Sequence, residues 1–389
     1  MSGTHPFRDR TAIAGIGRTD YSKNSGVSTL TLALRAIRAA LDDAGLATSD
    51  VDGVACHRVG DSVQATIVAQ SLGIKDIRFH LDLFGGGSQS AWTVGLAAQA
   101  VAAGVADCIV CWRSINARSG FRMGGTGRAA PDSIEFQYQS PYWLATPPQQ
   151  FAMYGRAYMD KYGVTAEDLG RVAISQREFA TLNPRAMMQA PLSMDDYLES
   201  RMIVEPFRLF DCCLETDAAV AVVVTSTERA RTLRQRPVLV SSAACGGGHT
   251  LYSNGRDDLS TSGAAQLAPR LFDAAEMSPS DIDIAELYDA FTPLVLLQLE
   301  DYGFAAKGEG AALVAAGSTS LGGSLPVNTH GGHLSEGYVH GLNHLAEAVD
   351  QLRGDAGPRQ TDGAEVALVT GQPGYVAGTS SALILRADK

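Results

Sequence analysis

One stretch of the chain concentrates residue types that bind ligands and move protons. Between Pro326 and His344 the sequence reads PVNTHGGHLSEGYVHGLNH, with four histidines and four glycines around one tyrosine, Tyr338. Glycine lets backbone amides come close to a ligand and reach positive φ angles. A tyrosine, whose unperturbed pKa is about 10, can act as a general acid or base once its surroundings tune it. The stretch therefore predicts a loop that faces a substrate.

A helix is expected directly after this loop, because Leu342, Leu345, Ala346 and Val349 recur at helical spacing. The positive end of a helix stabilises negative charge that develops beside it. The loop and the helix together predict a site where an anion forms.

The four histidines of the loop could also be ligands of a metal ion. His330 and His333 are three residues apart, and His340 and His344 are four apart, which is spacing found in zinc sites. No cysteine or carboxylate cluster completes a ligand set in the sequence, so we expect no metal. We interpret His333 and His340 as residues that orient Tyr338.

A second glycine-rich turn runs from Phe84 to Ser90 and reads FGGGSQS. It lies between a predicted strand over residues 77–83 and an alanine-rich helical pattern that ends near Ala103. A strand, a glycine turn and a helix present either a nucleophile or a backbone oxyanion hole at the helix N-terminus. Since no cysteine occurs between Phe84 and Val101, a thiol nucleophile is missing here.

The six cysteines do not form a disulfide framework in a chain of 389 residues. Cys108 and Cys111 have C-x-x-C spacing, but they lie in an apolar run in which a strand would point them to opposite faces. We interpret them as structural thiols. The segment from Cys245 to His249 is the best alternative nucleophile, although a turn at a strand end is the better interpretation of it.

The overall composition excludes several classes of protein. The net charge is −11, whereas a nucleic-acid surface needs basic patches. No apolar run reaches the roughly 18 residues of a membrane span, and residues 1–10 lack the apolar core of a signal peptide. We expect a soluble, cytoplasmic protein.

Strands and helices alternate along the chain in two sets, separated by a break at residues 235–237. This order predicts an α/β protein with an N-terminal half at 1–234 and a C-terminal half at 235–389. The first half includes an excursion at 113–205 whose start is rich in arginine. These arginines could meet a phosphate or be solvated, and the glycines at 15 and 17 are interpreted as turn residues.

The loop around Tyr338 resembles the Asn-x-x-Gly-Gly…Gly-His-Pro motif of the thiolase superfamily. Asn328, Gly331, Gly332 and Gly337 match, but Tyr338 replaces the active-site histidine and Val339 the proline. By its spacing to the glycine at 87, the family's nucleophilic cysteine would fall at Phe84. Two further loops correspond, Tyr288-Asp-Ala-Phe291 to the family's Asn-Glu-Ala-Phe and Thr370-Gly-Gln-Pro-Gly374 to its late Cys-x-Gly. The segment 206–225 resembles the sterol-carrier-protein-x and lipid-transfer-protein branch, in which Cys212 and Cys213 are structural.

The resemblance implies a five-layered thiolase fold with two equivalent halves, but without the nucleophile an acyl-enzyme is disfavoured. The sequence is similar to the steroid side-chain-cleaving aldolases. In these enzymes, tyrosines at the loops that correspond to those of Tyr288 and Tyr338 cleave a 3-hydroxyacyl-CoA to a ketone and propionyl-CoA or another short acyl-CoA. Tyr288 and Tyr338 are therefore the expected catalytic residues, supported by Asp289, His333 and His340. The residues expected to bind substrate or oxyanion are Phe84, Gly85, Gly86, Gly87, Asn328, Gly331, Gly332, Gly371 and Gly374.

The resemblance also implies partners. We expect a homodimer whose edge lies within residues 99–112, in complex with a small OB-fold, zinc-ribbon acyl-CoA-associated protein. Coenzyme A belongs to the substrate, and no other cofactor is expected. Two alternatives stay open: an acyltransferase with a relocated nucleophile such as Cys245, and a subunit that binds acyl-CoA or lipid without catalysis.

Overall fold

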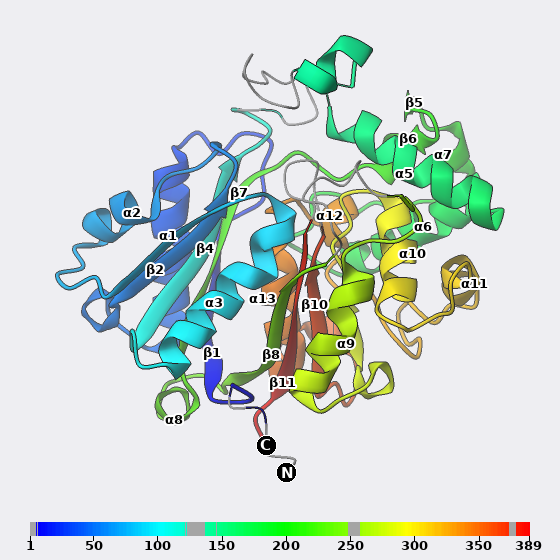
Figure 1. Cartoon of the computed structure of the whole chain (residues 1–389). Helices are drawn as coiled ribbons and strands as arrows, with labels where there is room; N and C mark the ends of the chain where they lie inside the picture. The colour runs from blue at the N-terminus through cyan, green and yellow to red at the C-terminus, as the bar shows by residue number, and fades with distance from the viewer. Residues whose placement is uncertain are drawn as a thin grey trace.

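The computed structural model of the chain describes residues 5, 7–120, 122, 137–144, 146–247, 257–372 and 379–389. This part of the chain combines a large central sheet with helices packed on its faces, which confirms the predicted α/β class (Figure 1). No helix within these residues has the length and apolar character needed to cross a membrane.

A nine-stranded mixed sheet organises the molecule, with the strand order β3-β2-β4-β7-β1-β8-β11-β10-β9. A separate hairpin-like pair, β5 (Met202–Val204) and β6 (Phe207–Arg208), lies outside it. The strands of the large sheet are β1 (Thr11–Arg18), β2 (Gly53–Arg58), β3 (Phe79–Phe84), β4 (Cys108–Asn116), β7 (Asp217–Ser226), β8 (Val238–Gly246), β9 (Ile284–Glu286), β10 (Val366–Gly371) and β11 (Ser380–Ala387).

The large sheet repeats one strand pattern on either side of a narrow seam. At the seam, β1 pairs with β8 through Ala12 opposite Leu239 and Ile13 opposite Val238. On one side of the seam, β1 pairs with β7 and β7 with β4 in antiparallel fashion, and β4 then pairs with β2 in parallel. On the other side, β8 pairs with β11 and β11 with β10 in antiparallel fashion, and β10 then pairs with β9 in parallel. The domain boundary predicted at residue 234 stays a prediction, and it falls in the connection just before β8.

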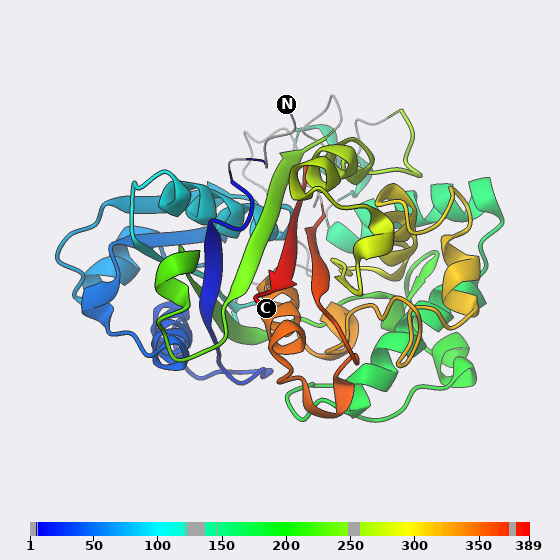
Figure 2. The same ribbon diagram turned by 90° about the horizontal axis from the view of Figure 1, so that it is seen from below.

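Helices form three layers around the two parts of the sheet (Figures 1 and 2). α1 (Thr29–Ala44) and α2 (Ala65–Leu72) cover the outer face of the N-terminal strands. α3 (Ser90–Ala102) and α13 (Leu342–Arg353) lie in the middle and contact strands from both halves. α9 (Ala264–Ala275), with α10 (Thr292–Asp301) beside it, covers the C-terminal strands. This is the five-layered arrangement predicted from the resemblance.

Sequence patterns explain how these elements bury their side chains. β7 reads DAAVAVVVTS, and its alternate residues join two different cores: Val220, Val222 and Val224 pack toward the central helices, whereas Ala221 and Val223 pack toward α1. A strand buried on both faces is apolar at nearly every position. Cys108 and Cys111 of β4 likewise join opposite cores as free buried thiols, as predicted.

The excursion of the N-terminal half forms a cap beside the C-terminal half, at the upper right of Figure 1. Its main helix α6 contacts α10, α11 and α12. The cap and its neighbours comprise α5 (Pro147–Tyr162), α6 (Ala166–Thr181), α7 (Met194–Glu199), α11 (Gly310–Ala315) and α12 (Gly332–Ser335).

Three predictions about this part of the chain are wrong. The proposed dimer edge at residues 99–112 cannot be an edge, because β4 is flanked by β2 and β7, and the end strand of the sheet in the N-terminal half is β3. Arg113 does not belong to the excursion predicted at 113–205: it lies within β4 and is completely buried. Gly15 and Gly17 are not turn residues, because both lie within β1, where α1 packs directly on the strand.

The close approach of α1 to β1 predicts a stability defect on adding one methyl group. A Cβ at Gly17 would lie 2.2 Å from the Ala36 carbonyl oxygen and 2.4 Å from the Ala40 nitrogen. We expect Gly17→Ala to lower the free energy of unfolding by about 1 to 3 kcal/mol, since helix and strand must separate. Denaturant titration measures this, with Arg38→Ala on the exposed face of α1 as a control that changes stability by less than about 0.5 kcal/mol. A free energy of unfolding that is the same in Gly17→Ala as in wild type would contradict this close packing of α1 on β1.

Candidate active site

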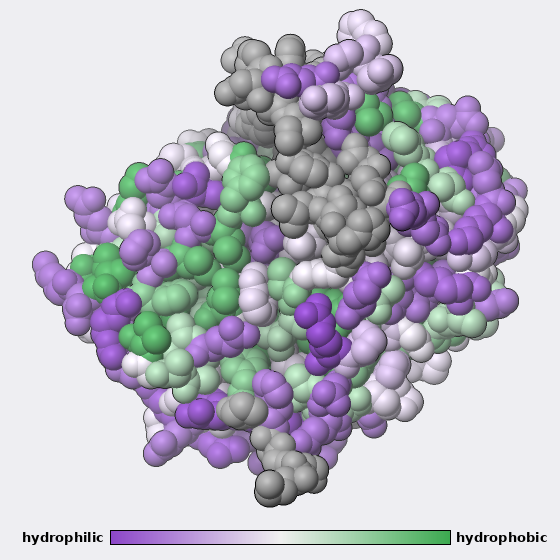
Figure 3. Space-filling view, viewed as in Figure 1, coloured by the Kyte–Doolittle hydropathy of each residue, from purple (hydrophilic) through white to green (hydrophobic). Residues whose placement is uncertain are grey.

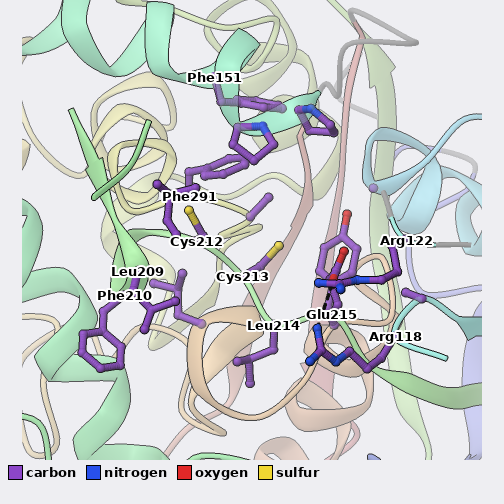
Figure 4. A pocket seen from close by; sticks show the side chains of 18 of the residues that line it. Arg118, Arg122, Phe151, Leu209, Phe210, Cys212, Cys213, Leu214, Glu215 and Phe291 are labelled. Carbon is purple, nitrogen blue, oxygen red and sulfur yellow. Dashed lines mark hydrogen bonds and ion pairs between the residues drawn. The ribbon is translucent and has the colours of Figure 1, made fainter. Parts of the chain in front are cut away.

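A pocket of about 470 Å³ lies where the predicted loops converge. Gly86 and Gly87 from the turn after β3 line it, together with Tyr288 from the turn after β9 and Tyr338 and His340 from the loop before α13. Figure 4 shows Phe151 and Phe291 on one side of this pocket, and Arg118 and Arg122 converging on Glu215 on the other. The pocket thus combines an apolar wall with a charged rim.

The two predicted catalytic tyrosines meet in this pocket. Their hydroxyl oxygens are 2.6 Å apart and share a hydrogen bond. The backbone N–H of Tyr288 donates to Thr370 Oγ1 at 2.9 Å, and its carbonyl accepts from Gln298 Nε2 at 2.7 Å. The backbone N–H of Tyr338 donates to Thr216 Oγ1 at 3.1 Å. Residues far apart in the chain therefore fix both tyrosines.

Both tyrosines are protonated at neutral pH, and burial makes their ionisation still less favourable. Burial raises the pKa of Tyr288 far above its ordinary value, although the hydrogen bond from Tyr338 opposes this. Burial also raises the pKa of Tyr338, and the neighbouring Tyr288 adds to the rise. A free phenolate is thus not available as a resting base.

The side chain of Tyr288 occupies space that a side chain on the glycine turn would need. A Cβ at Gly87 would lie only 1.9 to 2.3 Å from the ring carbons and hydroxyl of Tyr288. Phe84, the position assigned to the family's nucleophile, is 69% exposed at the end of β3, and neither Phe84 nor Gly85 is part of the pocket lining. Successive side chains of a strand point to opposite sides of the sheet, and the side chain of Phe84 points to solvent.

The remaining predicted binding residues hold the loops together rather than line the pocket. Asn328 adopts a positive φ of 53°, and its Oδ1 accepts from the Leu287 N–H at 2.7 Å. A Cβ at Gly331 would lie 2.6 Å from Ala180 Cβ, and one at Gly332 2.1 Å from Asp289 Oδ2. Gly371 lies against the glycine turn, where a Cβ would be 2.3 Å from the Gly87 carbonyl. Gly374 lies outside the described residues.

Asp289 connects the two tyrosine loops. Its carboxylate accepts from the His333 N–H at 3.0 Å and from the Leu334 N–H at 3.3 Å, and lies 2.9 Å from His344 Nε2. Burial would raise the pKa of Asp289, but His333 and His344 hold it well below its usual range. The His333 ring packs edge-on against both Tyr288 and Tyr338, with centroids 4.8 Å away in each case. Asp289 and His333 therefore lie directly beside the tyrosine pair, and their supporting role stays a prediction.

The chain of buried groups continues away from the pocket. His344 Nδ1 lies 3.0 Å from His330 Nε2, and His330 Nδ1 lies 3.1 Å from Glu286 Oε2. Burial would lower the pKa of His330, but Glu336 and Glu286 raise it to about 9. A histidinium among carboxylates is therefore stable here.

The reason given above for expecting no metal is wrong, because the fold does bring carboxylates to the histidines. Two fully buried groups have ligand atoms close enough to hold an ion, Glu286 with His330 and His344, and Asp289 with His333 and His344. Within each group, however, the histidines and the carboxylate already lie at hydrogen-bonding or ion-pairing distance from one another. That no metal binds stays a prediction.

Several functional features escaped the sequence analysis. Cys212 and Cys213 line the pocket, although both were interpreted as structural, and burial raises the pKa of both thiols. Arg113 contacts His340 directly beneath the pocket. A charged residue directly after the apolar run Cys-Ile-Val-Cys-Trp was the signal that could have revealed it.

Comparisons with known proteins agree with this geometry. Residues 246–387 match the family model "Thiolase C-terminal domain-like". The chain is 45% identical over 388 residues to a steroid side-chain-cleaving aldolase of Thermomonospora curvata, covering 97% of this chain and 98% of the relative. It is 44% identical to a 17-hydroxy-3-oxo-4-pregnene-20-carboxyl-CoA lyase of Mycobacterium tuberculosis, covering 96% and 98% of the two chains. The solved structure of an Ltp2-ChsH2(DUF35) aldolase superposes with a TM-score of 0.92 at 44% identity, covering 98% of this chain and 99% of that one.

The fold and the altered loops define a member of the thiolase superfamily that lacks the family's cysteines, in which Tyr338 stands at the histidine position and Tyr288 opens the loop that corresponds to Asn-Glu-Ala-Phe. Within that superfamily, the chain belongs to the family of the steroid side-chain-cleaving aldolases.

The charged state of His330 predicts a pH dependence of stability. Because its pKa rises from an ordinary 6.5 to about 9 on folding, the charged form stabilises the folded state fully below pH 6.5. This contribution, at most about 3 kcal/mol, is lost as the pH rises through 9. Melting temperatures of wild type should fall between pH 6.5 and 9.5, and His330→Gln should remove most of this slope.

The matched control is His57→Gln. Burial and Arg113 lower the pKa of His57 to about 3, so that histidine does not titrate in the same window. If the melting temperature falls equally with pH in wild type and in His330→Gln, His330 is neutral in the folded protein.

Proposed function

We propose that this chain is a carbon-carbon lyase that cleaves a steroid side-chain 3-hydroxyacyl-CoA, such as a 17-hydroxy acyl-CoA, by a retro-aldol reaction to a ketone and propionyl-CoA or another short acyl-CoA. The observation that carries the proposal is the hydrogen-bonded pair of Tyr288 and Tyr338 in the pocket, beside a turn that has no room for a nucleophilic side chain. The family relationship supports the substrate class.

The reaction needs one proton to leave an oxygen and one to reach a carbon. The 3-hydroxyl loses its proton, its C–O bond becomes a carbonyl, and the bond between Cα and Cβ breaks. The bonding electrons move into the thioester as an enolate, and a proton added at Cα gives the acyl-CoA. Atoms and charge balance without water or an added cofactor.

The raised pKa of both tyrosines favours a relay over a free phenolate base. One hydroxyl accepts the substrate proton while it passes its own proton to the second tyrosine, which protonates Cα. The 2.6 Å separation of the two oxygens suits this transfer. Backbone amides of Gly86 and Gly87, which line the pocket, hold the enolate oxygen.

The rest of the pocket suits the two ends of such a substrate. Phe151, Phe291 and Leu334 offer an apolar wall for a steroid. Lys23, Arg118 and Arg122 lie at the same pocket, where cationic groups can meet coenzyme A phosphates.

We also propose that the chain works in an assembly. The relative with the solved structure is an Ltp2-ChsH2(DUF35) aldolase, so a DUF35 protein, in the form of a small OB-fold zinc-ribbon subunit, is the expected partner here. We place the homodimer contact at β3, the end strand of the sheet in the N-terminal half, instead of at residues 99–112. The exposed Ile77 and Phe84 lie at this edge, and Figure 3 shows hydrophobic residues on the same side of the molecule, beside α3.

The thiol alternative predicts a covalent acyl-enzyme. Cys245 lies on β8 and is not part of the pocket lining, which argues against it as a nucleophile. Cys213 does line the pocket, but burial raises its pKa, and a protonated thiol is a poor nucleophile.

Replacing Cys213 separates the two mechanisms. We expect Cys213→Ala to keep kcat within about fivefold of wild type, because only packing changes, whereas a lost covalent nucleophile typically reduces kcat by many powers of ten. Cleavage is followed by mass spectrometry of the ketone and acyl-CoA products. Loss of activity with an unchanged melting temperature would favour the acyltransferase alternative.

Removing either tyrosine hydroxyl tests the proposed chemistry. We expect Tyr288→Phe and Tyr338→Phe each to lower kcat by ~100 to 10,000-fold, the range typical of general acid or base catalysis. Stability should change by only about 1 kcal/mol, because one hydrogen bond is lost. The control is Tyr302→Phe, a buried tyrosine away from the pocket, which should leave kcat unchanged. Activity within threefold of wild type in both site variants would show that the two tyrosines are packing residues, and the proposed tyrosine chemistry would fail.

A further inference from the structure

A buried arginine beneath the pocket makes an unusual contact. The guanidinium of Arg113 is fully buried, and its Nε donates a hydrogen bond to His340 Nδ1 at 2.9 Å. Its Nη2 lies 2.6 Å from the same nitrogen and also pairs with the carboxylate of Asp61. Asp61 balances the charge, but it does not explain why the cation is directed at an imidazole.

This contact fixes the tautomer of His340. A guanidinium has only donors, so Nδ1 must present its lone pair to Arg113. The ring proton then resides on Nε2. The adjacent cation also opposes a second proton: burial and Arg113 together hold the pKa of His340 well below its ordinary value. His340 is therefore a neutral imidazole with one N–H group.

That N–H group lies at the substrate side of the ring. His340 lines the pocket with Gly86, Gly87 and Tyr338. A Cβ at Gly86 would lie 3.2 Å from His340 Nε2, so this nitrogen adjoins the glycine turn that lines the pocket. The ring also packs edge-on against Tyr338, with centroids 4.8 Å apart.

The backbone of His340 adopts a conformation that side-chain-bearing residues seldom take. Its φ is 49°, in the left-handed region. Such residues persist where surrounding contacts determine them, and they cluster at functional sites. Here the conformation places the imidazole between Arg113 and the pocket.

We propose that His340 is a further catalytic residue, whose Nε2–H donates a hydrogen bond to the thioester oxygen of the substrate, and that Arg113 is the residue that positions it. This inference rests on the proposed retro-aldol function. As the bond between Cα and Cβ breaks, its electrons place negative charge on the thioester oxygen. A donor held in place for that charge contributes more in the transition state than in the ground state. His340 keeps its proton throughout.

Two substitutions distinguish the two ring nitrogens. In His340→Gln the side-chain amide reaches the place of Nε2 and can still donate into the pocket. In His340→Asn the shorter amide reaches only the place of Nδ1, where its oxygen can still accept from Arg113. Asparagine also adopts positive φ readily, so His340→Asn is the variant better suited to the fold. A purely structural role for His340 therefore predicts that asparagine is the better replacement.

The assay measures enolate formation without cleavage. The full chain, in complex with the DUF35 partner proposed above, is incubated with propionyl-CoA in D₂O, and exchange at Cα is followed by mass spectrometry. Cleavage of the 3-hydroxyacyl-CoA is measured in parallel, and rates are normalised to the folded fraction from thermal unfolding. We expect His340→Asn to lose about 100- to 1,000-fold in both rates, with KM within threefold, as for other single oxyanion donors. His340→Gln should be at least tenfold faster than His340→Asn.

The outcomes separate the two proposals. If wild type neither exchanges nor cleaves, the proposed function fails and this inference fails with it. If wild type does both, and His340→Asn equals or exceeds His340→Gln, His340 is a structural partner of Arg113 and the inference alone is overturned.

Discussion

The hydrogen bond between the hydroxyls of Tyr288 and Tyr338 is the interaction on which the site depends. It requires an empty space beside the glycine turn, because any side chain at Gly87 would overlap the ring of Tyr288. Both loops must also be held firmly, since a small displacement would separate the two oxygens. Thr370 and Gln298 hold the first loop, and Thr216 holds the second. The thiolase fold is thus retained while different side chains fill its reactive centre.

Buried charges beneath the pocket also hold the loops of the site in place. Asp289 accepts hydrogen bonds from the backbone of the Tyr338 loop, and its pairing with His333 and His344 compensates for the loss of solvation. Arg113 acts similarly on the other side of the pocket, where Asp61 balances its charge and His340 accepts its hydrogen bond. Paired charges in a buried polar network make the structure around them rigid, which suits a site that must hold two tyrosines at a fixed separation.

Local patterns in the sequence were sufficient to predict the alternating elements and the two tyrosines, because strand and helix periodicity and loop motifs involve neighbouring residues. Contacts across the fold were not predictable in this way. Arg113 was predicted to begin the excursion at 113–205, since nothing adjacent in sequence shows that Asp61 and His340 contact its buried guanidinium. The dimer edge was misplaced for the same reason: strand order depends on pairing between distant segments. The exposed direction of Phe84 likewise follows from the register of β3 rather than from its distance to Gly87.

The central claim is that Tyr288 and Tyr338 act as one proton carrier, and a double variant tests it most directly. Residues that work as a unit show strongly non-additive losses. If the relay operates, Tyr288→Phe combined with Tyr338→Phe should have a kcat/KM within about threefold of the slower single variant, because either substitution already breaks the relay. If the double variant instead loses the product of the two single losses, the tyrosines act independently and the account is wrong.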